Sequence, residues 1–261
     1  MNNGKQMIAQ LQSLLKSHQA YSDGIYGNLS DTSSNQSAEI ELRERVAAEH
    51  YDNYLDALSR SHSISVMDYE VDLFLARIPR GGLILDIGGC WGWHWRRLAQ
   101  IRPDVGVIII DFMRSNLPHA QNILGSLIGN QVVLMHAEAT ELPFVVDEGF
   151  AGFDGVWTVH TFQHIPNFGK AVSEAYRLLK KNGVFINYSL NVQPHIRWLK
   201  RLFGREYLSE GWMEGAFWLS RASKIQKECI ASVFGNTVSE RWLEILYSPE
   251  LRFYAPGRGE V

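Results

Sequence analysis

The strongest constraint on the fold is a short apolar run that ends in an acid and continues into glycines. Residues 83–94 read Leu-Ile-Leu-Asp-Ile-Gly-Gly-Cys-Trp-Gly-Trp-His. Successive branched apolar residues suit a strand that is covered on both faces, as in a parallel sheet packed by helices. The glycines allow the backbone to approach a ligand closely, and a helix that opens at Trp93 points its unpaired N–H groups toward that ligand. The stretch predicts a buried strand, a binding turn and a helix.

The alternation of strand and helix continues along the chain. Four more strands are predicted at 105–111, 132–137, 153–159 and 184–190, and two final antiparallel strands at 237–246 and 251–254. Helices are predicted between them at 93–101, 115–128, 167–181 and 220–234. This order predicts an α/β fold with a doubly wound, mostly parallel, seven-stranded sheet of the Rossmann-like type.

The flanks of this alternating region suggest the domain organisation. Residues 1–77 are expected to form an N-terminal helical cap with a flexible linker, and residues 78–261 the main domain with a lid or substrate insertion at about 191–219. Within that insertion, residues 195–205 interleave apolar and basic side chains. They could form a lid, a membrane-surface helix or a packed helix with a solvated basic face, and the packed helix is favoured over membrane binding.

Composition narrows the choice of partners. A formal charge of −3 gives no general electrostatic reason to bind nucleic acid, so no nucleic-acid partner is expected, and a small neutral or cationic substrate stays open. Cys90 and Cys229 make neither a disulfide framework nor a metal-ligand spacing, so no metal is expected and the cytoplasm is the expected compartment. No run approaches the ~20 apolar residues that a membrane span requires.

A second acid follows the second predicted strand. Asp111 stands 111 − 86 = 25 residues after Asp86, near the ~20 residues at which a nucleotide-binding fold presents an acid to ribose hydroxyls. A carboxylate can accept hydrogen bonds from both vicinal hydroxyls of a ribose. The alternative is that Asp111 caps the following helix. The apolar strand before it favours ribose binding.

The turn after the first strand resembles motif I of class I S-adenosylmethionine-dependent methyltransferases, in which an acid precedes glycines at its second, fourth and sixth following positions. Here these positions hold Gly88, Cys90 and Gly92, with Gly89 one place before the missing middle glycine. A cysteine costs more than glycine if that position requires a positive φ. The G-x-G-x-x-G dinucleotide fingerprint does not fit this spacing.

A second resemblance lies after the third predicted strand. The segment from Glu138 and Ala139 to Leu142-Pro143-Phe144 resembles the family's acid-Ala-x-x-Leu-Pro-Phe element. In that family the acid meets the exocyclic amine of adenine. Glu138 stands where aspartate is usual, which lengthens the arm by one methylene. An apolar turn is the alternative interpretation of the last three residues.

The segment after the fourth predicted strand resembles motif IV and the post-strand region of the small-molecule branch. It reads His-Thr-Phe-Gln-His-Ile-Pro from His160 to Pro166, and Gln163 replaces the first histidine of a pair that is common there. His160 is the better candidate for a general base, and His164 for a structural residue. The alternative is that one or both histidines only hydrogen-bond the backbone or pack in the pocket wall.

Together these resemblances imply a methyltransferase that uses S-adenosyl-L-methionine and methylates oxygen or carbon of a small-molecule acceptor. A non-catalytic cofactor-binding regulatory or scaffold protein and, less favoured, an NAD-dependent oxidoreductase stay open. The oligomeric state cannot be read from the sequence. The expected cofactor-binding residues are Asp86, Gly88, Gly89, Cys90, Gly92, Asp111, Phe112, Glu138, Ala139 and Thr158.

Overall fold

The computed structural model describes residues 62–188 without interruption. Outside that range it describes residues 11, 14, 15, 23–27, 41, 198, 202, 203, 211–213, 216–218 and 223–235. Nearly all of the predicted strand and helix alternation lies inside these ranges. The two predicted final strands, at 237–246 and 251–254, lie outside the described residues.

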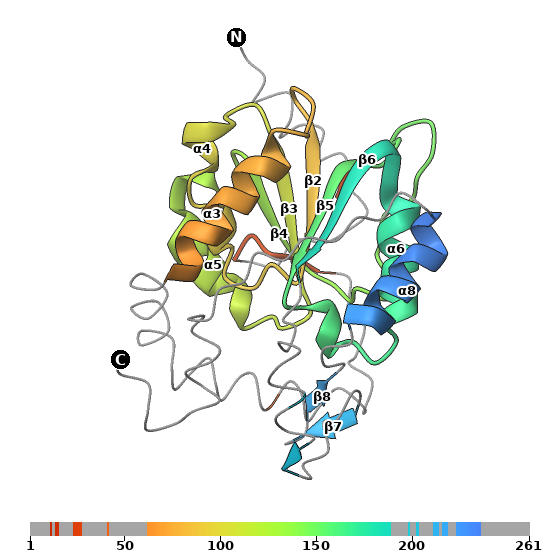
Figure 1. Ribbon diagram of the computed structural model, residues 1–261. Helices are drawn as coiled ribbons and strands as arrows, with labels where there is room; N and C mark the ends of the chain where they lie inside the picture. Colours follow the sequence, from red (N-terminus) through yellow and green to blue (C-terminus); the bar gives the residue numbers. More distant parts are fainter. Residues whose placement is uncertain are drawn as a thin grey trace, which may run out of the picture.

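A parallel sheet of six strands forms the centre of the fold (Figure 1). Its strand order is β1-β4-β3-β2-β5-β6, and every neighbouring pair is parallel. The strands are β1 Tyr26–Gly27, β2 Leu83–Ile87, β3 Gly106–Asp111, β4 Val132–His136, β5 Phe153–Val159 and β6 Leu179–Tyr188. The α/β doubly wound prediction is confirmed, with six strands in the described part of the chain instead of the seven expected.

Helices cover both faces of the sheet (Figure 1). On one face lie α3 His62–Leu75, α4 Leu98–Ile101 and α5 Asn116–Leu124, and on the other α6 Phe168–Leu178 and α8 Ser223–Phe234. The short helical turns are η1 Trp93–Trp95, η2 Gly125–Leu127 and η3 Phe162–His164. A separate antiparallel pair, β7 Gly211–Met213 and β8 Ala216–Trp218, lies near η3, which follows β5.

The side chains of β2 show why this strand must be central. Leu83, Leu85 and Ile87 enter the core cluster on the α6 side, and Ile84 enters the cluster on the α3 side. All five residues of the strand are buried. A strand that faces an apolar layer on each side needs apolar residues at successive positions, and this is the pattern of the sequence.

The N-terminal residues that are described also contact the sheet. Leu11 and Leu15 are fully buried against the α6-side core, and the Leu15 N–H donates to the Leu11 carbonyl as in a helical turn. β1 was not predicted, because a two-residue strand has no alternation to detect. The proposed boundary between a cap at 1–77 and a domain from 78 stays a prediction.

The junction of α6 and β6 differs from the prediction. The helix begins as expected, with the Asn167 side chain accepting the Lys170 N–H at its start, but it ends at Leu178 instead of 181. Leu179 already pairs with Phe153, and a register shift separates this pair from the regular pairing that starts at Gly155 with Val184. Extra residues accommodated as an irregularity in one strand do not show in hydrophobic periodicity.

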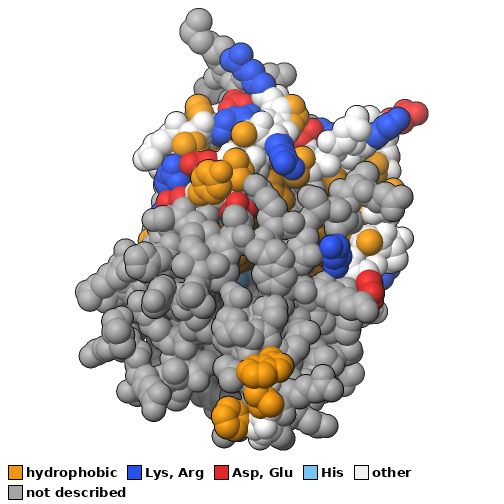
Figure 2. All heavy atoms as spheres, viewed as in Figure 1, with side chains coloured by type: hydrophobic (Ala, Val, Ile, Leu, Met, Phe, Trp, Pro, Cys, Tyr) orange, Lys and Arg blue, Asp and Glu red, His pale blue; other side chains and the backbone are white. Residues whose placement is uncertain are grey.

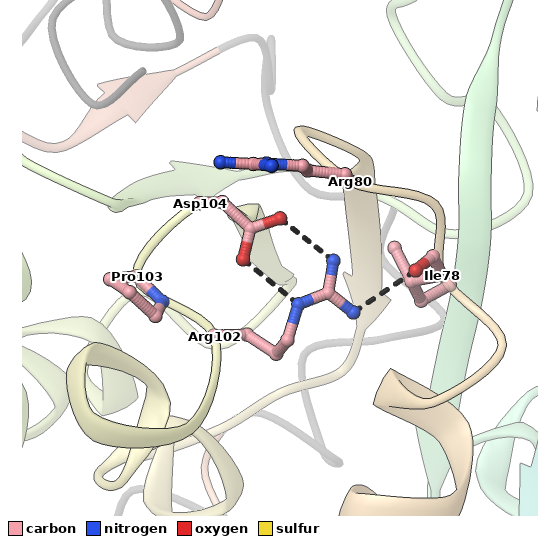
Figure 3. Close-up of a pocket in the computed structure, with 5 residues that line it drawn as sticks. All are labelled: Ile78, Arg80, Arg102, Pro103 and Asp104. Atoms are coloured by element: carbon pink, nitrogen blue, oxygen red, sulfur yellow. Dashed lines mark hydrogen bonds and ion pairs between the residues drawn. The ribbon is translucent and has the colours of Figure 1, made fainter. Parts of the chain in front are cut away.

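An arginine joins α3 to the amino ends of β2 and β3. Arg102 donates to the carbonyls of Leu75, Ile78 and Pro79 and makes two bonds to the Asp104 carboxylate. Figure 3 shows the bonds from Arg102 to Asp104 and to the Ile78 carbonyl, at a hollow of about 490 Å³ that is also lined by Arg80 and Pro103. Because the five bonds occupy all the N–H groups of the guanidinium, Arg102 closes the end of α3 and offers no free donor to a ligand.

The surface near this end of the sheet carries charges of both signs. Figure 2 shows Lys and Arg side chains interspersed with Asp and Glu over the upper part of the face in view. Paired charges include Arg96 with Asp68 and Arg97 with Asp72, which link η1 and the start of α4 to α3.

Candidate functional site

The strand order creates a switch point at the centre of the sheet. From β2 the chain continues outward through β3 and β4 on one side, and it returns to β5 and β6 on the other. Loops that leave the carboxyl ends of β2 and β5 therefore diverge, and in open α/β sheets ligands bind in the crevice outside this point. The predicted site residues lie in these loops and at the neighbouring strand ends.

The turn after β2 has the geometry of a glycine loop in spite of its cysteine. The φ angles of Gly88, Cys90 and Gly92 are 72°, 51° and 68°. Cys90 therefore holds a left-handed conformation that costs a non-glycine residue about 1–2 kcal/mol. The condition stated from the sequence is met: the position of the missing glycine does require a positive φ.

The glycines are required by close packing of the protein against the loop. A Cβ at Gly88 would lie 2.2 Å from the Thr161 side chain, and one at Gly89 would lie 2.3 Å from the Asp86 carboxylate. A Cβ at Gly92 would lie 2.7 Å from Leu124. The loop thus packs against the turn that follows β5, the end of β2, and α5. A side chain at any of the three glycine positions would displace the loop.

Asp86 contacts the glycine loop and the turn η1 that follows it. Its carboxylate is buried and accepts the Trp95 indole N–H at 2.6 Å. Burial raises the pKa of Asp86 to about 7, the Trp95 hydrogen bond opposes this, and the negative charge of Asp111 adds to it. The structure places Asp86 next to the backbone of Gly89 and against Trp95, the last residue of η1.

Asp111 ties the loop to the end of β3. Its carboxylate accepts backbone N–H groups of Cys90 at 2.9 Å and Met113 at 2.7 Å, and the Asn116 side-chain amide at 3.3 Å. The helix α5 begins at Asn116 with Ser115 as its N-cap. Asp111 is therefore not the cap of that helix, and the alternative considered from the sequence is not what the structure shows.

The segment after β4 runs beside this acid. The Ala137 N–H donates to the Asp111 carbonyl, and Glu138 turns its carboxylate back toward the N–H and hydroxyl of Thr140, both at 3.3 Å. Ala139 is buried. At the same edge, the carbonyl of Phe112 lies 3.0 Å from Nε2 of His136. Glu138, Ala139 and Phe112 thus lie at strand ends next to Asp111, as the sequence suggested.

Thr158 and His160 mark the end of β5. The Thr158 side chain is fully buried, and its hydroxyl has no hydrogen-bond partner within the described residues. His160 has a φ of 54°, donates its N–H to the Tyr188 carbonyl at 2.8 Å, and stacks its ring on Tyr188 with centroids 5.5 Å apart. A left-handed histidine is uncommon and suggests a functional constraint.

His164 lies deeper in the turn η3. Its backbone N–H donates to Thr161, and its Nε2 is 3.3 Å from the amide nitrogen of Gln163, which is itself buried. These contacts give Gln163, which replaces a histidine of the related pattern, a place in the same turn. The structural role preferred for His164 stays a prediction.

Two aromatic residues of this region were not identified from the sequence. His94, in η1, packs edge-on against Trp157 with centroids 5.7 Å apart, and Tyr188 at the end of β6 stacks on His160. Burial lowers the pKa of His94 to about 4, and the nearby positive charges of His160 and Arg96 add to this. The imidazole of His94 is therefore neutral at pH 7. Its position two residues after Gly92 is the signal that could have indicated it.

Residues 195–205 are described only in part. Trp198 and Leu202 are helical and one turn apart, and Trp198, Leu202 and Phe203 are 61%, 61% and 78% exposed. A packed helix would bury some apolar side chains, and these three are exposed; the choice among a lid, a membrane-surface helix and a packed helix stays a prediction. None of the helices within the described ranges has the length and apolar character to cross a bilayer.

Acidic residues at three neighbouring strand ends, beside a glycine turn on a doubly wound sheet, define the class of α/β folds that present a nucleoside site at the switch point. Within this class, residues 85–187 match the family model described as a methyltransferase domain. The match agrees with the resemblance of the sequence to class I S-adenosylmethionine-dependent methyltransferases.

Curated proteins of similar sequence are named as methyltransferases. A demethylmenaquinone methyltransferase of Listeria welshimeri is 28% identical over 132 residues, which cover 49% of this chain and 53% of that protein. A malonyl-(acyl-carrier protein) O-methyltransferase of Geobacter sulfurreducens is 30% identical over 135 residues, which cover 52% and 46%. The chain thus spans about half the length of the curated relatives it matches.

A solved structure shows the same fold over most of the chain. The 1,6-didemethyltoxoflavin-N1-methyltransferase of Burkholderia thailandensis, solved with 1,6-didemethyltoxoflavin and S-adenosylhomocysteine, has a TM-score of 0.55. The match covers 83% of this chain and 86% of that one, at 14% sequence identity.

Proposed function

We propose that this protein transfers a methyl group from S-adenosylmethionine to a small-molecule acceptor at the carboxyl edge of the sheet. The observation that carries the proposal is the junction between the glycine loop and Asp111. Cys90 donates its N–H to the Asp111 carboxylate, while the N–H groups of Gly88 and Gly89 donate to the Ile110 carbonyl. The glycines of the loop allow part of a ligand to lie close to the loop backbone. The junction holds this loop next to an acid that can bind a ribose.

The residues of this edge suit the cofactor in order along the sheet. The loop of Gly88, Gly89, Cys90 and Gly92, supported by Asp86, would hold its amino-acid end. Asp111 would accept hydrogen bonds from the ribose hydroxyls, and the Glu138–Ala139 segment would frame the adenine. Phe112 and Thr158 complete the proposed set. S-adenosylmethionine supplies an electrophilic sulfonium methyl, so the protein's part is to align an acceptor with it and exclude water.

The acceptor would lie where β5 and β6 end. His160, stacked on Tyr188, faces this edge together with His94. A neutral imidazole can take the proton from a hydroxyl acceptor as the methyl group arrives, which makes His160 the proposed general base. An acidic phenol or carbon acid would need less of this help, and then alignment is the main source of catalysis.

The atom that is methylated is proposed as oxygen or carbon. The printed names of similar proteins specify a 24-C, an O and an N1 position, so they do not choose among the three. They do name small acceptors or acceptors carried on a protein. We propose a small hydroxylated or carbon-acid molecule, acted on in the cytoplasm.

The test is methyl transfer from isotopically labelled S-adenosylmethionine to a panel of phenols, carbon acids and amines. The proposal expects label in a phenol or carbon acid, and His160→Ala should lower kcat by about 10²–10⁴ with little change in the KM for the cofactor. His164→Ala is the matched control and should stay within a few fold of the parent. Parent-like turnover of His160→Ala would leave this histidine in the pocket wall. Cofactor binding without transfer to any acceptor would favour the regulatory alternative.

A further inference from the structure

Two oppositely charged side chains of α6 hydrogen-bond to the backbone of the segment that follows β4. Arg177 donates to the carbonyls of Phe144 at 2.7 Å and Leu142 at 3.0 Å, and Glu174 accepts the Leu142 N–H at 3.0 Å. The two side chains also bind each other, through Arg177 Nε to Oε1 at 3.1 Å and through Nη2 to Oε2 at 2.6 Å. We call these two residues the α6 clamp.

The α6 clamp is more than a surface ion pair. The Glu174 side chain is only 10% exposed, and Leu142 and Phe144 are buried. Burial raises the pKa of Glu174, but the hydrogen bonds from Arg177 and Leu142 more than offset it and hold the pKa below its usual value. The carboxylate is therefore ionised at neutral pH, and charge-assisted bonds of this kind are stronger than neutral ones.

Leu142 and Phe144 lie at the end of the segment 137–144, and the start of this segment is also held by a hydrogen bond. At its start, the Ala137 N–H donates to the Asp111 carbonyl, and at its end the clamp holds Leu142 and Phe144. Between these anchors, the Glu141 N–H donates to the Glu138 carbonyl and closes a turn. The position of Glu138 therefore depends on both anchors.

We propose that Glu174 and Arg177 are positioning residues for the adenine end of the cofactor, acting through the backbone of residues 138–144. This inference rests on the proposed function. Neither side chain needs to touch the cofactor, because the clamp sets where the Glu138 turn stands relative to Asp111. Its loss should weaken recognition of the adenine amine in particular, and leave the rest of the cofactor site in place.

The test compares two ligands by calorimetry: S-adenosylhomocysteine, and S-inosylhomocysteine, in which a carbonyl replaces the adenine amine. In Arg177→Ala, affinity for the adenosyl ligand should fall about tenfold, as expected for one lost hydrogen bond. Affinity for the inosyl ligand should change by less than about threefold, because it lacks the donor that Glu138 would meet. The ratio between the two affinities therefore shrinks.

Two further variants separate positioning from folding. Arg177→Lys keeps the charge beside Glu174 but not the planar fork that reaches two carbonyls, so it should also reduce the ratio. Lys170→Ala removes the more distant ion pair with the same Glu174, at 3.8 Å and on a half-exposed side chain, without touching residues 142–144, and should leave the ratio unchanged.

An equal loss of affinity for both ligands in the Arg177 variants would overturn the inference, because it would indicate general loosening of the site. Unchanged affinities would overturn it as well. If the parent protein bound neither ligand, the proposed function itself would fail, and this result is distinguishable from the other two.

Discussion

Cys90 and His160 hold positive φ angles on either side of the switch point, and the remaining described non-glycine residue with this conformation is Asn182, in the irregular first part of β6. Asparagine tolerates the left-handed region, but cysteine and histidine are held there at a cost. Strained residues persist where the surrounding structure fixes them, and they cluster at functional sites. Their placement in the two loops of the candidate site therefore supports its assignment.

The raised pKa of Asp86 predicts that the free energy of unfolding depends on pH. Its pKa is about 7 in the native protein against 3.8 for the ordinary group, so between these values the native state binds a proton that the unfolded state has lost. The stabilising contribution of Asp86 to the free energy of unfolding is fully present below the ordinary pKa of 3.8. It falls as pH rises toward about 7, by at most about 1.4 kcal/mol per pH unit.

Urea unfolding of the parent protein and of Asp86→Asn, at several pH values from about 5 to about 8, isolates this term. Asparagine keeps an oxygen for the Trp95 N–H but does not titrate. The parent should lose stability relative to the variant as pH rises to about 7, and the difference should then level off. A difference that does not change with pH would mean that the buried carboxylate is already ionised in the native state.

The sequence predicted the positions of the acids after β2 and β3 better than the contacts around His160. Asp86 and Asp111 could be identified because each ends an apolar strand, which is a local pattern. The position of His94 just after the loop could have indicated that residue, but the proximity of His94 and Tyr188 to His160 depends on how η1, β5 and β6 meet in space. The same holds for the close contact of Gly88 with Thr161, which lie 73 positions apart.

At the scale of elements, long apolar strands and amphipathic helices were predictable, and irregular joints were not. β2 to β5 lie close to their predicted positions because each is buried on both faces. β6 starts earlier than predicted because the chain departs from regular pairing after Leu179. The α6 clamp and the Arg102 bonds use charged side chains to fix neighbouring backbone, and sequence periodicity contains no signal for either.

Arg102 allows a stability prediction for the joint between α3 and the sheet. Arg102→Ala leaves three backbone carbonyls and Asp104 without their donor, so the free energy of unfolding should fall by about 3 kcal/mol. Arg97→Ala is the matched control. It removes ion pairs of 3.3 and 3.4 Å from a one-third-exposed side chain, and should cost less than about 1 kcal/mol.

Denaturant unfolding gives both values, and affinity for S-adenosylhomocysteine provides a second measurement. Arg102 lies at the amino end of the strands, so the folded Arg102→Ala variant should bind this ligand as the parent does. Equal stability of the two variants would contradict the role of Arg102 as the link between α3 and the sheet.

At the scale of the whole molecule, the site is a consequence of strand order. Two helical layers bury both faces of the sheet and leave its carboxyl edge for the glycine loop, the acids and the histidines. The alternation of strands and helices predicted this architecture from the sequence. It predicted neither β1 nor the exposure of the apolar side chains of Trp198, Leu202 and Phe203.

The central claim is that the glycine loop and Asp111 bind S-adenosylmethionine, and calorimetry with S-adenosylhomocysteine and with NAD tests it most directly. The parent should bind the first ligand and not the second, and Asp111→Ala should weaken binding by about 1.5–3 kcal/mol while remaining folded. Asp72→Ala, a change at a half-exposed carboxylate on α3, should bind like the parent. Binding of NAD in preference, or an unchanged dissociation constant in folded Asp111→Ala, would contradict the account.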